Sequence, residues 1–303
     1  MAWTEASFLR ARGEHVMNSK TSIPSPSLHA PAQVEQLANL PVGPIRPRKR
    51  IKTLQNLAPQ KSFTQVKIVT NPIYSAAIVP PSKLELFTAP PAGTTLSGFM
   101  AAHPGMPCAV NGGFFDLLPG AGMVPTGLVI SGGTCWWPSS LQVAEGQDKR
   151  RLMHADKAKR ESQWSQVFFI SLERDCGFIS SVMEFDSRFR QTDYSDLYLA
   201  IEAGPRLISN GLLAPDEFGR LGSANTSLQR TAIGVKENGE VILFCSKVPL
   251  TFPQVAEQLL AMGAVDAMAL DGGPSSGFEA GGKPSAQAGQ NTSPLNTILF
   301  TLP

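Results

Sequence analysis

The sequence contains two glycine-rich corners, Asn111-Gly112-Gly113-Phe114-Phe115-Asp116 and Asp271-Gly272-Gly273-Pro274-Ser275-Ser276, each directly after a short apolar run that is typical of a strand. A Gly-Gly pair permits positive φ and leaves backbone N–H groups open to a ligand. Each corner also places a carboxylate beside these N–H groups. The two corners therefore predict one pocket at strand ends, with room for a phosphate or a sugar.

Two further segments lie between the corners along the chain, Ala203-Gly204-Pro205-Arg206-Leu207-Ile208 and Arg230-Thr231-Ala232-Ile233-Gly234-Val235. In this order the four segments resemble the phosphodiester glycosidase family, and the resemblance runs from about Phe63 to Leu299. That family includes an enzyme that removes N-acetylglucosamine from a phosphodiester, so the resemblance implies a hydrolase of sugar phosphodiesters. Pro274 departs from the family pattern, which usually has glycine there. Because proline has no N–H, we expect this corner to offer a ligand one donor fewer.

The composition is that of a globular protein without a strong charge. The chain has 303 residues, of which 42% are hydrophobic, and a formal net charge of +2. This length allows one large core or two small ones, and the charge gives no bias toward polyanions or membranes. No apolar run reaches the roughly 18 residues that a membrane span requires. We expect no nucleic-acid partner and no membrane span, and the sequence leaves the oligomeric state open.

The first 60 residues differ from the remainder. They contain Ser-Pro and Pro-rich runs without sustained apolar periodicity, which predicts a disordered tail over residues 1–60 and a single catalytic domain over residues 61–303. A basic stretch at residues 46–52 can contact phosphates on nucleic acid or lipid. It has no aromatic residues beside it, so we interpret it as a solvated linker.

Two kinds of evidence bear on the cellular compartment of the protein, and they disagree. A secretory signal needs an apolar stretch of about 7 to 15 residues, and none follows Met1 or Met17. The chain as written therefore reads as cytoplasmic, whereas the family resemblance implies export to the periplasm or the exterior. The four cysteines lack C-x-x-C spacing and lie in apolar surroundings, so we expect buried free thiols, with pairing in an oxidising compartment as the alternative. They are Cys108, Cys135, Cys176 and Cys245.

Short, turn-bounded apolar runs dominate the rest of the chain and predict the fold class α/β, in the α+β sense: a mixed, largely antiparallel sheet with packed helices. Asn238-Gly239 predicts an antiparallel hairpin. Gly132-Gly133 and Gly281-Gly282 lack an adjoining acid and are interpreted as ordinary turns. The expected strands are residues 66–69, 76–79, 84–87, 108–110, 127–130, 167–170, 197–201, 232–235, 241–244, 267–270 and 297–300.

One helix is clearly marked in the sequence. Thr251 and Gln254 form a capping box, an apolar i, i+4, i+7 pattern follows, and Gly263 ends the helix. The chain then enters the strand that leads to Asp271, so a helix packed on the sheet would fix the position of that corner. A second helix, or a loop or lid, is expected within residues 147–165.

The available side chains limit the chemistry. Only His103 and His154 lie beyond the tail and no H-E-x-x-H motif is present, which disfavours zinc hydrolases, and a nucleophilic serine is not expected without a nearby base. Cleavage between a sugar C1 and a phosphate passes through an oxocarbenium-like state, which needs a carboxylate near C1 or near the attacking water. The departing phosphate is a good leaving group but requires positive charge.

Asp271 is the first choice for that carboxylate, because an apolar strand delivers it rigidly to a Gly-Gly loop. The alternative is a turn aspartate that accepts hydrogen bonds from its own loop. Glu202 and Asp116 are the next acids. Glu202 follows a buried strand and, if buried, needs a partner or a raised pKa, which is typical of a functional site. Asp116 can instead cap the turn after Phe115.

Arg230 is the leading candidate for binding phosphate, because a guanidinium meets two phosphate oxygens at once and Thr231 can add a hydroxyl donor. A surface salt bridge is the alternative for Arg230, and a structural role is equally expected for Arg206, which could support the same phosphate. Phe114 and Phe115 are expected in the core rather than under a sugar. The remaining candidates for binding sugar hydroxyls or phosphate are Asn111, Gly112, Gly113, Gly272, Gly273, Ser275 and Ser276.

The sequence therefore predicts a hydrolase that cleaves a small or polymeric glycosyl phosphodiester without an organic cofactor. No metal ligand set is recognised, and a divalent cation near Asp271 or Asp116 is left open. One alternative is a carbohydrate-binding module without catalysis, which would lack two carboxylates about 5 to 9.5 Å apart around one cleft. The other is a phosphodiesterase that cleaves P–O, which would favour a metal pair held by acids.

Overall fold

A computed structural model describes residues 65–118, 122–141, 165–214, 225–287 and 294–303. These residues belong to one compact unit, Leu57–Pro303. The expected tail over residues 1–60, with its basic stretch, lies outside the described residues, as do residues 147–164 of the expected second helix. Among the helices that are described, none is long and apolar enough to cross a membrane.

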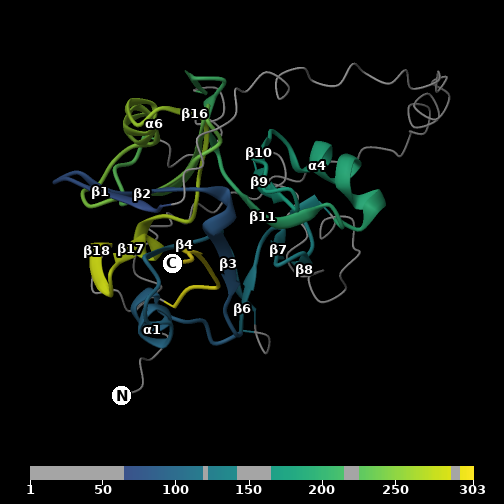
Figure 1. The fold of residues 1–303 in the computed structure, drawn as a ribbon, viewed down its shortest axis with the longest axis horizontal. Helices are drawn as coiled ribbons and strands as arrows, with labels where there is room; N and C mark the ends of the chain where they lie inside the picture. Colours follow the sequence, from purple (N-terminus) through teal and green to yellow (C-terminus); the bar gives the residue numbers. More distant parts are fainter. Residues whose placement is uncertain (1–64, 119–121, 142–164, 215–224, 288–293) are drawn as a thin grey trace, which may run out of the picture. The chain divides into compact units, whose positions relative to one another are not determined.

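Strands in the described ranges form three antiparallel sheets and a two-stranded ribbon (Figure 1). The seven-stranded sheet has the order β1 (Lys67–Thr70), β2 (Tyr74–Val79), β15 (Val241–Ser246), β14 (Thr231–Lys236), β16 (Ala264–Ala269), β12 (Arg206–Ser209) and β13 (Leu212–Leu213). One five-stranded sheet has the order β10 (Cys176–Ile179), β9 (Gln166–Ser171), β11 (Leu197–Ala203), β7 (Val129–Ser131) and β8 (Thr134–Trp137).

The other five-stranded sheet has the order β18 (Lys283–Gln287), β17 (Gly277–Ala280), β4 (Cys108–Asn111), β19 (Thr297–Thr301) and β3 (Leu84–Thr88), and the ribbon pairs β5 (Phe115–Leu118) with β6 (Gly122–Pro125). Short 3-10 turns occupy Pro81–Lys83, Arg190–Thr192 and Gly273–Ser275. The predicted α+β class with a largely antiparallel arrangement is confirmed, although the strands divide among several sheets.

The three sheets share one hydrophobic core. Its buried side chains come from each of them, for example Leu243 on β15, Ile201 on β11 and Val110 on β4. Successive residues of a strand point to opposite faces, so the neighbouring Phe244 lies on the outer face of its sheet, in a second cluster. Both faces of β15 are therefore buried, which explains why its sequence is a continuous apolar run.

A short helix covers the outer face of each sheet, and Figure 1 shows α6 beside β16 and α4 beside β9. The helix α6 (Phe252–Ala261) packs on the seven-stranded sheet, and its predicted capping box at Thr251 is present. The helix α4 (Val182–Phe189) covers the sheet of β9, and α1 (Leu96–Ala102) covers that of β4. The α6 packing fixes β16, the strand that leads to Asp271.

The predicted turns are confirmed. Residues Glu237 to Glu240 join β14 to β15 as an antiparallel hairpin. The pair Gly132-Gly133 joins β7 to β8, and Gly281-Gly282 joins β17 to β18, with positive φ at all four glycines. Positive φ at both central residues matches the twist of antiparallel hairpins, which explains why glycine occurs there.

Candidate active site

The ends of three strands meet at one corner of the fold. Strands β14 and β16 are antiparallel, with Ala232 opposite Ala269, so the start of β14 and the end of β16 lie at the same sheet edge. Arg230 directly precedes β14, and Asp271 follows β16 by two residues. The end of β4 reaches the same corner, because the Asp271 N–H donates to the Gly112 carbonyl at 3.1 Å.

Asn111 connects these segments through its side-chain amide. Its Nδ2 donates to the Asp271 carbonyl at 2.7 Å. Its Oδ1 accepts from the Thr231 hydroxyl at 2.7 Å and from the Gly277 N–H at 3.0 Å. Asn111 is 1% exposed, so these hydrogen bonds are shielded from water. The structure thus brings Asn111, Thr231 and Asp271 together, with the Thr231 hydroxyl used inside the fold.

The N–H groups of the first corner are also used inside the fold. Gly112 donates to the Thr297 carbonyl at 2.8 Å, and Gly113 donates to the Thr297 hydroxyl at 2.9 Å. A Cβ on Gly112 would lie 2.4 Å from the Thr297 hydroxyl oxygen, and one on Gly113 would lie 3.1 Å from the Glu202 carbonyl oxygen. Neither glycine has positive φ. Close packing, rather than backbone conformation, therefore requires glycine at both positions.

The N–H groups of the second corner likewise donate to atoms of the fold. The Gly272 N–H donates to Asp271 Oδ1 at 2.9 Å, and the Gly273 N–H donates to the Gln229 carbonyl at 2.8 Å. Only Gly273 has positive φ, at 61°. The N–H of Ser276 donates to the Gly273 carbonyl at 3.1 Å. The backbone amides therefore fix the shape of the corner and hold one Asp271 carboxylate oxygen.

Two serines follow in this corner. Ser275 is half-buried, and Ser276 is 3% exposed. Within the described part of the chain, the Ser276 hydroxyl oxygen has no hydrogen-bond partner. A buried hydroxyl without a partner is uncommon in folded proteins and calls for an explanation, such as a ligand or a water.

Arg230 lies buried at the edge of this corner. Its Nε donates to the Leu250 carbonyl at 3.2 Å, and its Nη2 donates to the Thr226 carbonyl at 2.7 Å. The guanidinium lies over the Phe252 ring, 4.1 Å from the ring centre. Burial lowers the pKa of Arg230, but a guanidinium stays protonated in proteins. Its Nη1 lies 3.8 Å from where a Cβ on Gly272 would stand, so a buried cation borders the Asp271 loop.

Glu202 lies near the end of β11 and packs against the first corner. Its backbone contacts Gly113, but its carboxylate points toward another segment. Oε2 accepts from the N–H groups of Leu128 and Ser140, both at 2.9 Å, and Oε1 accepts from the Ser140 hydroxyl. Burial raises the pKa of Glu202, and the hydrogen bonds from Ser140, Leu128 and Ser165 oppose this shift.

Two other candidates lie outside the hydrogen-bond network of Asn111. Arg206 forms an ion pair with Asp266 at 2.8 Å, near the start of β16, whereas Asp271 follows its end. Asp116 lies on β5, opposite Val124 in the ribbon. Among the residues that the structure describes, no three His, Cys, Asp or Glu side chains are grouped as a metal site would need. The cation near Asp271 or Asp116 stays a prediction.

Three residues that shape this region were not predicted from the sequence. Thr297 holds both glycines of the first corner, Phe252 covers the Arg230 guanidinium, and Ser140 holds Glu202. Thr297 and Phe252 lie in segments that were correctly predicted as a strand and a helix, but their partners are distant in sequence. Ser140 lies in no recognisable motif.

Comparisons with known proteins place this chain in a class of glycosidases. The profile described as NAGPA, phosphodiester glycosidase, matches residues 105–301. This match covers more than half of the sequence, and the chain belongs to the phosphodiester glycosidase family. The family predicted from the four sequence segments is therefore confirmed. A search of curated proteins gives no match.

Solved structures show the same fold at low sequence identity. The catalytic domain of zebrafish N-acetylglucosamine-1-phosphodiester alpha-N-acetylglucosaminidase is 17% identical with a TM-score of 0.58, and the match covers 79% of this chain and 82% of that chain. A hypothetical protein from Synechocystis is 15% identical with a TM-score of 0.50, covering 78% and 61%. A protein from Burkholderia pseudomallei K96243 is 15% identical with a TM-score of 0.50, covering 76% and 74%. At such identities the likeness concerns the fold.

Proposed function

We propose that the corner around Asp271 hydrolyses a glycosyl phosphodiester to a free sugar and a phosphate monoester. One observation carries the proposal: the Asn111 amide binds both the Asp271 carbonyl and the Thr231 hydroxyl at 2.7 Å. Because Arg230 directly precedes Thr231, this amide ties the Asp271 loop to the segment that carries the buried guanidinium. Membership of the phosphodiester glycosidase family supports the same reaction.

Asp271 is proposed to act on the attacking water. Its Oδ1 accepts from the Gly272 N–H, which sets the orientation of the carboxylate. The carboxylate takes a proton from water as the water oxygen bonds to C1. The bond between C1 and the bridging oxygen breaks, and its electron pair leaves with the phosphate monoester. The proposed reaction uses no organic cofactor.

Arg230 is proposed to bind the phosphate. The carbonyls of Leu250 and Thr226 and the Phe252 ring fix the plane of its guanidinium, so little rotamer entropy remains to be lost when phosphate binds. In a buried site a positive charge stabilises the negative charge that develops on the leaving group. The buried Ser276 hydroxyl is proposed to donate to the same ligand.

The other candidates receive supporting roles in this proposal. Glu202 holds Leu128 and Ser140 in place, and Asp116 is retained as a second acid near the sugar. The ion pair of Arg206 with Asp266 stabilises the pairing of β12 with β16. Gly112 and Gly113 permit the close packing that brings Asn111 to Asp271.

Hydrolysis in oxygen-18 water tests the reaction. Label in the hydroxyl of the released sugar would support cleavage of the C–O bond, whereas label in the phosphate would mean P–O cleavage by a phosphodiesterase. A screen in which the protein turns over no phosphodiester-linked sugar, yet binds carbohydrates, would favour a binding module.

Matched variants test the two charged residues. Asp271→Asn should abolish turnover while the far-UV circular dichroism spectrum stays native, and a wild-type rate would remove Asp271 from the mechanism. Arg230→Lys should weaken phosphate-bearing ligands far more than neutral sugars, because lysine keeps the charge but loses the paired donors. Arg206→Ala removes a charge outside the corner and is the control. Equal losses for both ligand classes in Arg230→Lys would argue for a structural role.

A further inference from the structure

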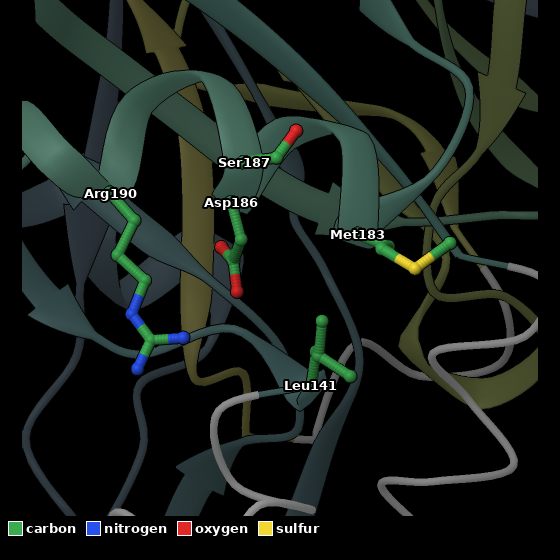
Figure 2. A pocket seen from close by; sticks show the side chains of 5 residues that line it. All are labelled: Leu141, Met183, Asp186, Ser187 and Arg190. Atoms are coloured by element: carbon green, nitrogen blue, oxygen red, sulfur yellow. The ribbon is translucent and has the colours of Figure 1, made fainter. Parts of the chain in front are cut away.

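Two hollows in the described part of the chain differ in the side chains that line them. The hollow beneath α4 is lined by an acid and a cation, and Figure 2 shows the Asp186 carboxylate and the Arg190 guanidinium there. The Asp186 carboxylate accepts from the Ser139 hydroxyl at 2.8 Å and so is already bound within the fold. The second hollow, of about 510 Å³, lies at the C-terminal end of α1, and its described lining contains no Asp, Glu, Lys or Arg.

This second hollow, the α1 hollow, is lined by three side chains that can each offer an electron pair to a soft metal ion. They are Met100, His103 and Met106, at intervals of three residues along the chain. The rest of the described lining is alanine, proline and glycine, and includes the Gly281-Gly282 turn between β17 and β18. The polar chemistry of the α1 hollow therefore comes from two thioethers and one imidazole.

Two consecutive backbone turns bring these three residues to one place. The His103 N–H donates to the Met100 carbonyl at 3.3 Å, and the Met106 N–H donates to the His103 carbonyl at 3.4 Å. A turn closed between residues three apart holds their Cα atoms within about 7 Å of each other. Pro104 and Gly105 occupy the centre of the second turn, where the Gly105 φ of 95° is one that glycine adopts without strain.

The orientation of the His103 ring leaves one nitrogen with an unused lone pair. Its Nδ1 lies 2.8 Å from the Phe99 carbonyl oxygen, which can only accept, so Nδ1 carries the proton. In the neutral ring Nε2 is then an acceptor, and it has no hydrogen-bond partner among the described residues. The ring also stacks on Phe99, with 4.3 Å between the ring centres. Histidines that bind metals are commonly fixed in this way, by donation from the other ring nitrogen to a carbonyl.

The two methionines supply sulfur beside this ring. Met100 is 5% exposed and packs in the apolar cluster beneath α1, and Met106 packs against the same cluster. Methionine is flexible and usually fills the gaps of a core. Both side chains nevertheless border an open volume, so a rotation of each thioether can direct its sulfur into the hollow while the rest of the side chain stays packed.

We propose that the α1 hollow binds one copper(I) ion through the sulfurs of Met100 and Met106 and through Nε2 of His103. Thioether ligands select copper(I), whereas magnesium and calcium require oxygen ligands and zinc is bound by thiolate, imidazole or carboxylate. The hollow lies at the start of β4 and the first corner lies at its end, so the metal site is separate from Asp271 and takes no part in the proposed hydrolysis.

Silver(I), a soft ion of the same charge that is not readily oxidised, tests the site on the untagged full chain. Every measurement uses a Cys135→Ser background, because the exposed Cys135 thiol would itself bind either ion. With carbon-13 in the methionine methyl groups, NMR should show the resonances of Met100 and Met106 shifting and reaching saturation at one equivalent of silver(I). The resonance of Met183, an exposed methionine that lines the α4 hollow, should stay in place.

Competition with the copper(I) chelator bicinchoninate measures the affinity. Met100→Leu, Met106→Leu and His103→Phe should each weaken copper(I) binding at least about tenfold, because loss of a ligand costs no less than loss of the groups that orient it. Leucine and phenylalanine preserve most of the volume and the stacking on Phe99, so the fold should be kept. Met183→Leu is the matched control and should bind copper(I) as tightly as the parent chain.

Three results would overturn the metal site. The first is a silver(I) titration in which the methyl resonances of Met100 and Met106 do not move, or an unchanged copper(I) affinity in Met106→Leu. The second is an equal loss of affinity in Met183→Leu, which would mean that methionines bind the ion wherever they are exposed. The third concerns zinc(II), which should leave the methionine resonances in place, so equal shifts with zinc(II) would overturn the assignment to a soft ion.

Discussion

Replacement of Asn111 by alanine should measure how strongly the corner is held together. The amide makes three hydrogen bonds, to Asp271, Thr231 and Gly277, and Asn111 is 1% exposed. Each such bond contributes about 1 kcal/mol net, and a buried partner left without one costs at least as much. Asn111→Ala should therefore lower the free energy of unfolding by about 3 kcal/mol. For a domain of this size the Tm should fall by roughly 6 to 12 °C.

Urea unfolding followed by far-UV circular dichroism provides the measurement, with Thr231→Val as the partner variant. Thr231→Val removes one of the three hydrogen bonds with little change of shape and should cost about 1 kcal/mol. Because the two residues share that bond, the double variant should cost about 1 kcal/mol less than the sum of the single variants. In folded Asn111→Ala protein, kcat should fall as well, because the Asp271 loop loses its anchor.

A different outcome would refute the reasoning. An unfolding midpoint for Asn111→Ala equal to that of the wild type would show that other contacts hold the corner. Strictly additive single variants would show that the Asn111 amide and the Thr231 hydroxyl are not energetically coupled.

Three further predictions concern glycine packing, pH and thiols. Gly112→Ala should destabilise the fold by at least about 2 kcal/mol in urea unfolding, since its Cβ would lie 2.4 Å from the Thr297 hydroxyl oxygen. The stability of Gly272→Ala should remain near that of the wild type, because its Cβ would lie 3.4 Å from the nearest atom. Equal losses of stability in the two variants would contradict the packing argument. Burial raises the pKa of Glu202 above its ordinary value of 4.5. The contribution of this carboxyl group to stability is therefore complete below pH 4.5 and is lost as the pH rises through the folded-state pKa. The Tm of Glu202→Gln should rise relative to that of the wild type as the pH increases, and parallel curves of Tm against pH would disprove this prediction. Ellman's reagent at pH 8 should label Cys135 first, because its thiol is exposed, although partial burial raises its pKa as well. Burial raises the pKa of Cys108 to about 11 and of Cys176 and Cys245 to about 12, so rapid labelling of all four thiols would contradict this order.

The sequence predicts those parts of the fold that local patterns encode. The α6 helix has its capping box and its terminal glycine, and the β14–β15 hairpin has Asn-Gly, so both are recognisable from neighbouring residues alone. The helices α1 and α4 are only 7 and 8 residues long and show too little periodicity to be recognised. The partition of the strands into three sheets depends on pairings between residues far apart in sequence.

The candidate site, like the fold, could be predicted from the sequence only in part. The two glycine corners could be predicted to meet, because each follows an apolar strand and carries an acid. The use of their amides could not be predicted, since it depends on Thr297 and Gln229, which lie in other segments. The ion pair of Arg206 with Asp266 likewise depends on the register between β12 and β16.

The bond between the Asn111 amide and the Asp271 carbonyl joins residues separated by 160 positions in the sequence. Such a contact forms only after much of the chain has found its place, and folds dominated by distant contacts assemble slowly. During refolding, recovery of catalysis should therefore lag behind recovery of secondary structure. The specific activity, in enzyme units per milligram, would then report the fraction of molecules that have folded completely.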